Sequence, residues 1–156
     1  MDERRAEEGV MLRKVAAGQA GQAGGSFAIV ASRYNALYVD AMLRAARDVL
    51  LGAKAKVRIV RVPGAFEIPA VAARLASSPR RYSAILCFGV IFQGETSHAR
   101  HIGWGVTQAL AQIQVLHKMP VIHAVFVFEK VKHAKVRCLG TKCSAPCGWT
   151  NSGDAG

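Results

Sequence analysis

Four short apolar segments, each separated from the next by a stretch with helical periodicity, constrain the fold of this chain more than any other feature. The segments are rich in β-branched residues, as strands are, and cover residues 27–32, 57–62, 84–88 and 121–128. Crossovers of this length predict parallel strands with right-handed connections and helices on both faces of the sheet. We therefore expect an α/β fold, a three-layer α/β/α sandwich with a four-stranded parallel sheet.

Capping residues and glycines mark the helices between these strands. Asn35 suits the N-cap of the first helix, and Gly52 suits the position just after its end. Gly103 and Gly105 weaken the first half of the third helix, which we interpret as a sign of close packing against a neighbouring element. The three helices are expected over about residues 36–51, 67–76 and 98–117.

The pattern within two strands predicts their places in the sheet. Residues 57–62 alternate charged and apolar side chains and predict an edge strand, whereas residues 121–128 are almost wholly apolar and predict a central strand. A parallel sheet that ends on an apolar strand needs one more helix, which we expect to begin between residues 130 and 137.

The chain has 156 residues, which predicts one domain. We place this domain at residues 26–137, after a glycine-rich arm of residues 1–25 that we expect to be disordered. Residues 138–156 form an atypical tail with several helix breakers and no helical period. Because no apolar run approaches the ~20 residues of a membrane span and the first residues lack a secretory pattern, we expect a cytoplasmic protein without membrane contact.

The formal net charge of +11 permits attraction to nucleic acid or to anionic ligands. The basic residues are scattered and do not alternate with aromatic residues, so a solvated basic surface is favoured and no nucleic-acid partner is expected. Four cysteines stand at positions 87, 138, 143 and 147, without the paired spacing of a zinc site. We expect Cys87 to belong to the core and expect no metal.

Candidate binding segments follow three of the predicted strands, at residues 33–35, 64–67 and 89–98. The carboxyl ends of parallel strands meet at one edge of the sheet, where ligands bind, so these segments should converge. Gly94 lies just before a helix whose first turn holds His98. Backbone N–H groups at such a helix start bind anions, and an imidazole beside them can transfer a proton near neutral pH.

Three stretches, in this order and spacing, resemble the 6,7-dimethyl-8-ribityllumazine synthase family: Arg33-Tyr34-Asn35, residues 62–69 (VPGAFEIP) and residues 89–98 (GVIFQGETSH). The resemblance covers about residues 27–137 and implies a flavodoxin-like fold. It implies a transferase of riboflavin biosynthesis that condenses 5-amino-6-ribitylaminouracil with 3,4-dihydroxy-2-butanone 4-phosphate, without a cofactor. It also implies a homo-oligomer, a pentamer or a multiple of one, with sites between subunits.

The resemblance implies roles for individual residues. His98 would be the catalytic proton carrier, and Arg137 matches an arginine that binds phosphate in the family. His123 stands where the family uses an aromatic residue from the next subunit, and a later phosphate-side Lys or Arg would align near Ala145. The implied substrate-binding residues are Tyr34, Asn35, Ala65, Phe66, Glu67, Val90, Ile91, Phe92 and His123, and the implied phosphate-binding residues are Gly94, Glu95, Thr96 and Arg137.

Other interpretations of these residues and of the whole chain stay open. Asn35 would be only an N-cap, Phe66 or His123 a core residue, and Arg137 a solvated charge. The atypical tail also fits a non-catalytic flavin-binding, lumazine-binding or shell-forming paralogue with the same fold. A basic nucleic-acid module and an unstable degenerate copy are the remaining alternatives.

Overall fold

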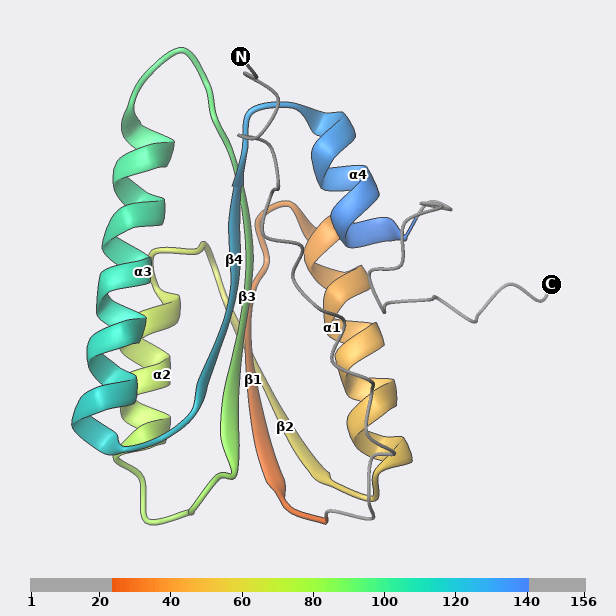
Figure 1. Ribbon diagram of the computed structural model, residues 1–156, viewed down its shortest axis with the longest axis vertical. Coiled ribbons are helices and arrows are strands. Elements are labelled where there is room, and N and C mark those ends of the chain that lie inside the picture. Colours follow the sequence, from red (N-terminus) through yellow and green to blue (C-terminus); the bar gives the residue numbers. More distant parts are fainter. Residues whose placement is uncertain (1–23, 141–156) are drawn as a thin grey trace, which may run out of the picture.

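A computed structural model describes residues 24–140 of the chain. In this part four strands and four helices alternate (Figure 1). The elements are β1 Ser26–Ser32, α1 Ala36–Gly52, β2 Lys56–Val62, α2 Ile68–Ala76, β3 Ala84–Phe92, α3 His98–His117, β4 Val121–Phe128 and α4 Val131–Leu139. Most of the expected N-terminal arm and of the expected tail, including Cys143 and Cys147, lies outside the described residues.

The strands form one parallel sheet in the order β2-β1-β3-β4. Helices α2 and α3 cover one face of the sheet, and α1 and α4 cover the other (Figure 1). The predicted three-layer sandwich and the predicted edge position of β2 are therefore confirmed. The expected last helix is α4, and it continues two residues past position 137, to Leu139.

The prediction that residues 121–128 form a central strand is wrong. Among the strands of residues 24–140, β4 lies at the edge of the sheet and pairs with β3 only. Ile122 is 50% exposed and Val127 is 38% exposed, so this apolar strand is incompletely covered within one copy of the chain. An apolar sequence indicates that a strand is suited to burial, but it does not tell whether its own subunit covers it.

Two apolar clusters lie on opposite faces of the sheet. On the face of α2 and α3, Val30, Ile85 and Cys87 contact Ile68 and Leu110. Cys87 is fully buried, which confirms its predicted place in the core. Burying a large aliphatic side chain contributes about 1.5–3 kcal/mol. The cluster on the other face consists of Ile29, Ala31, Tyr38, Val39, Leu43, Ala46, Phe88, Val90, Phe128, Ala134 and Cys138.

Glycines near the helices differ from the predictions at two points. Gly52 is the last residue of α1, and the left-handed residue that follows is Lys54, with φ 57°. At Gly103 an added Cβ would stand 2.5 Å from Cγ2 of Val127, which confirms close packing between α3 and β4. At Gly105 no described atom lies within 4 Å of such a Cβ, so the same interpretation is wrong there.

Candidate active site

A groove of about 710 Å³ lies at the carboxyl ends of β1, β2 and β3. The three predicted binding segments converge on it, together with the first residues of α3, as expected for a parallel sheet. Of the fourteen predicted site residues, the groove is lined by Tyr34, Asn35, Ala65, Phe66, Glu67, Val90, Ile91, Phe92, Gly94, Thr96 and His98. The other three, Glu95, His123 and Arg137, do not line it.

Backbone hydrogen bonds join the loops at the rim of the groove. Arg33 N donates to Val62 O over 2.7 Å, and Tyr34 N donates to Pro63 O over 3.1 Å. These bonds extend the pairing of β1 and β2 past the last residues of both strands. The loops after the two strands are therefore held beside each other before any ligand binds.

Asn35 joins the same rim to the neighbouring strand β3. Its Nδ2 donates to Val90 O over 2.7 Å, and the residue makes no side-chain hydrogen bond that caps α1. Asn35 therefore occupies the predicted N-cap position of α1, but its side chain bonds β3, so the alternative that it is only an N-cap is wrong. Its φ of 55° is left-handed, a conformation that asparagine tolerates better than most residues. Its Oδ1 remains available as an acceptor at the groove.

Glu67 shapes the loop after β2. Its Oε2 accepts a hydrogen bond from Gly64 N over 2.9 Å, and its other carboxylate oxygen is left for a ligand. A Cβ at position 64 would lie 3.1 Å from the same Oε2, so glycine lets the carboxylate approach the backbone closely. The loop therefore offers a negatively charged acceptor in a defined position.

Two exposed aromatic rings stand in this groove. Tyr34 is 72% exposed and Phe66 is 66% exposed, so the alternative that Phe66 is a core residue is wrong. Exposed rings within a concave site favour stacking on a flat ligand. Phe92, which lines the same groove, is held by an edge-to-face contact with Tyr38 at 5.5 Å between ring centroids.

The loop before α3 is suited to an anion. Gln93 Nε2 donates to Thr96 O over 2.8 Å, and Gln93 N donates to Phe128 O over the same distance, which braces the loop. Among the described residues, the Ser97 side chain makes no capping hydrogen bond and the first turn of α3 holds no acidic side chain. The N–H groups of this helix start are thus available to an anion, with exposed His98 beside them.

The three predicted residues outside the groove lie in two places. Glu95 is exposed in the loop before α3. His123 lies on β4, with its Nε2 3.0 Å from Thr107 Oγ1, and it is exposed, so the alternative of a core histidine is wrong. Arg137 lies on α4 with its guanidinium carbon 4.5 Å from the centroid of the Phe126 ring. His123 and Arg137 thus belong to the β4 edge of the molecule.

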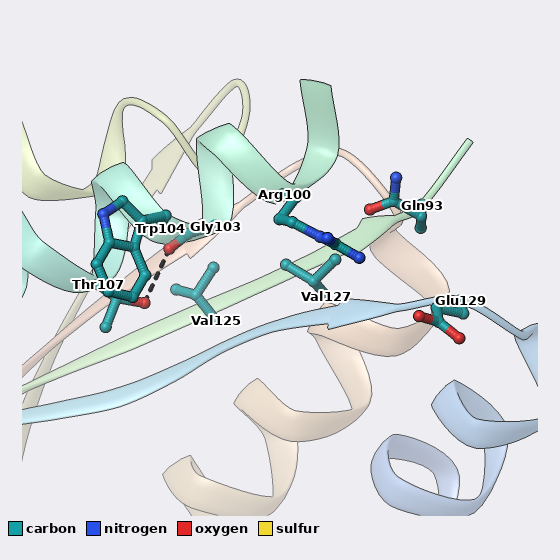
Figure 2. Close-up of a pocket in the computed structure, with 8 residues that line it drawn as sticks. All are labelled: Gln93, Arg100, Gly103, Trp104, Thr107, Val125, Val127 and Glu129. Atoms are coloured by element: carbon teal, nitrogen blue, oxygen red, sulfur yellow. Dashed lines mark hydrogen bonds between the residues drawn. The ribbon is translucent and has the colours of Figure 1, made fainter. Parts of the chain in front are cut away.

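A second, smaller groove of about 280 Å³ lies between α3 and β4, and the sequence analysis missed it. Figure 2 shows Arg100 lying across Val127, with Trp104 and Thr107 toward one end and Gln93 and Glu129 toward the other. Gly103 was the feature of the sequence that could have indicated this groove. It permits the close contact between α3 and β4 that forms the floor of the groove.

Several kinds of site have no support in the described chain. Between residues 24 and 140, no group of three or more His, Cys, Asp or Glu side chains could hold a metal ion. No helix in that stretch is long and apolar enough to cross a membrane. Burial raises the pKa of the Cys87 thiol to about 12, so this cysteine does not supply a thiolate near neutral pH.

Comparison with known proteins gives consistent matches. The sequence profile of 6,7-dimethyl-8-ribityllumazine synthase matches residues 24–153, which includes most of the tail that the sequence analysis set apart. A 6,7-dimethyl-8-ribityllumazine synthase of Stenotrophomonas maltophilia (strain K279a) is 39% identical over 118 residues, 74% of this chain and 76% of that protein. A 6,7-dimethyl-8-ribityllumazine synthase of Xanthomonas oryzae pv. oryzae (strain PXO99A) is 36% identical over 118 residues, which again cover 74% of this chain and 76% of that protein.

Proposed function

This chain belongs to the 6,7-dimethyl-8-ribityllumazine synthase family, and from that premise we propose that the groove at the ends of β1, β2 and β3 is its active site. There the protein would condense 5-amino-6-ribitylaminouracil with 3,4-dihydroxy-2-butanone 4-phosphate in riboflavin biosynthesis. One observation carries the proposal: a single groove holds two exposed aromatic rings, a free carboxylate oxygen, and an open helix start beside a histidine.

The chemistry places modest demands on the protein. The pyrimidine substrate supplies the attacking amine, the ketone of the second substrate is the electrophile, and water and phosphate are released as the ring closes. The substrates supply the reacting groups, so no nucleophilic side chain is required. The protein must hold two small molecules in register, which can supply several kcal/mol, and move protons, which typically adds ~10²–10⁴-fold.

The residues divide these tasks by position. Tyr34 and Phe66 would enclose the pyrimidine ring, and the open carboxylate oxygen of Glu67 would accept hydrogen bonds from the ribityl hydroxyls or the ring. The phosphate would bind the N–H groups of residues 94–96, in the loop just before α3. His98, in the first turn of α3, would then stand beside the departing phosphate, where a proton is needed.

We further propose a cytoplasmic homo-oligomer, most simply a pentamer, in which the β4 edge of one copy completes the groove of the next. His123 and Arg137 lie on this edge and do not line the groove of their own copy. Exposed apolar side chains on β4 and on the neighbouring α3, Ile122 at 50% and Trp104 at 67%, are suited to burial by a partner. A contact between two different surfaces generates a closed ring when its rotation closes.

Mixing two impaired variants, assayed at a low concentration of the phosphorylated substrate, tests the activity and the shared site together. His98→Ala should lower turnover by at least about a hundredfold. Arg137→Ala should weaken binding of the phosphorylated substrate by about 1.5–3 kcal/mol. If each site takes His98 from one copy and Arg137 from the next, equal refolded mixtures should hold both in about a quarter of the sites. Lumazine fluorescence of the mixture, compared with each variant alone, measures this recovery.

The controls separate the possible failures. His101 is exposed on the same helix as His98 but does not line the groove, so His101→Ala should keep nearly full activity. No recovery in the mixture would mean that each site lies within one copy. Wild-type protein that forms lumazine no faster than the spontaneous reaction would instead favour the non-catalytic flavin-binding or lumazine-binding paralogue.

A further inference from the structure

A threonine hydroxyl between α3 and β4 lies within hydrogen-bond distance of two groups. Thr107 Oγ1 lies 2.8 Å from Gly103 O and 3.0 Å from His123 Nε2. A hydroxyl has one proton to donate, and a carbonyl oxygen can only accept. The Thr107 hydroxyl donates to Gly103 O, and its oxygen keeps lone pairs that can accept from a protonated Nε2. In this arrangement the neutral His123 ring carries its proton on Nε2, and Nδ1 is bare.

The bare Nδ1 is open to a donor from outside the subunit. Within the described part of the chain, Thr107 is the one hydrogen-bond partner of the His123 ring. The residue is exposed on the edge strand β4 and faces α3. An exposed ring that is anchored at one nitrogen presents the other nitrogen in a defined direction, at a smaller entropic cost than a freely rotating side chain.

We propose that Thr107 is a positioning residue that fixes the Nε2–H tautomer of His123, so that Nδ1 accepts a hydrogen bond from an N–H group of the pyrimidine substrate. This proposal rests on the proposed function, in which the β4 edge completes the groove of a neighbouring copy. The aminopyrimidine substrate carries amino and ring N–H donors, whereas the phosphorylated ketone has no N–H group and offers a hydroxyl instead. A phenyl ring at position 123 would offer a face for stacking but no acceptor.

Nitrogen NMR of the full-length protein tests the tautomer without any reference to activity. At about pH 8.5 a free imidazole is neutral, and its protonated and bare nitrogens give separate signals. The wild-type ring of His123, identified by the signals missing in His123→Phe, should be protonated at Nε2 and bare at Nδ1. Thr107→Ser, which keeps the hydroxyl, should preserve this spectrum, and Thr107→Val should shift it toward the tautomer mixture of free histidine. Protonation at Nδ1 in the wild type, or an unchanged spectrum in Thr107→Val, would overturn the proposal.

Steady-state kinetics test the role of the acceptor. Loss of one hydrogen bond corresponds to about a 2–12-fold change in affinity, so Thr107→Val and His123→Phe should raise the KM for the aminopyrimidine by this factor. The KM for the phosphorylated ketone and kcat should stay within about twofold, and Thr107→Ser should match the wild type. An equal rise in both KM values, or no rise, would overturn the proposal. A wild type without turnover would contradict the proposed function instead, and the NMR result would still decide the tautomer.

Discussion

Replacing Asn35 tests whether the rim of the groove is built as described. The side chain donates to Val90 O over 2.7 Å, and its backbone has a left-handed φ of 55°. Two separate energies are therefore combined in one residue: a hydrogen bond between the β1–α1 loop and β3, and the tolerance of asparagine for a conformation that most residues avoid. Alanine removes both contributions, whereas glycine removes only the hydrogen bond.

The expected losses in the free energy of unfolding follow from these two contributions. A hydrogen bond of this kind contributes about 0.5–1.5 kcal/mol, and a left-handed residue with a Cβ costs about 1–2 kcal/mol. Asn35→Ala should therefore destabilise the protein by about 1.5–3.5 kcal/mol, and Asn35→Gly by about 0.5–1.5 kcal/mol. Both variants should lower kcat/KM by about tenfold or more, because the loop that carries Tyr34 is no longer fixed to β3.

Urea unfolding at one fixed protein concentration measures the losses, since unfolding of an oligomer depends on concentration. Lumazine formation followed by fluorescence measures kcat/KM on the same samples. Equal destabilisation by alanine and glycine would refute the contribution assigned to the backbone. A loss below about 0.5 kcal/mol in both variants would refute the contribution assigned to the hydrogen bond.

The remaining predictions concern the proton carrier, the α3–β4 contact and the buried thiol. His98→Ala should reduce kcat by at least about a hundredfold while the KM values change less, as rapid-mixing and steady-state assays would measure; parallel changes in both would point to a binding role. Gly103→Ala should destabilise the protein by about 1–3 kcal/mol in urea unfolding, because its Cβ would stand 2.5 Å from Val127 Cγ2. Gly105→Ala, with open space at the same helix, is the matched control and should stabilise it by about 0.5–1 kcal/mol. Burial raises the pKa of the Cys87 thiol from 9.0 to about 12 in the folded protein. The stability that the neutral thiol contributes is therefore complete below pH 9 and is lost as the pH rises from 9 to 12. Stability should therefore fall by up to about 1.4 kcal/mol per pH unit more steeply in wild type than in Cys87→Ala, and equal slopes would contradict the buried neutral thiol.

The rim of the groove was predictable because the order and direction of the strands determine which loops form it. Once the chain is read as alternating strands and helices, the loops after β1, β2 and β3 must meet at one edge of the sheet. The role of Asn35 was not predictable in the same way. Its preference for an N-cap is a local property, whereas its hydrogen bond reaches Val90, 55 residues away, and no local pattern contains such a partner.

The outer edge of the sheet was mispredicted for a related reason. The apolar sequence of β4 indicates a surface that prefers burial, but sequence alone does not tell whether the cover comes from the same subunit. The same uncertainty applies to His123 and Arg137, which the family pattern assigns to a site and which the fold puts outside the groove of their own copy. The proposed shared site between copies rests on combining the family pattern with this geometry.

Gln93 connects the second groove, between α3 and β4, with the loop before α3. It lines the outer groove between α3 and β4, while its side chain holds Thr96 O in the loop before α3. A neighbouring copy that fills this groove would contact the Gln93 side chain, whose amide also holds the loop in place. Assembly would then order the proposed phosphate-binding loop as well as supply side chains from the next copy. An isolated copy would hold the phosphate in a less ordered loop.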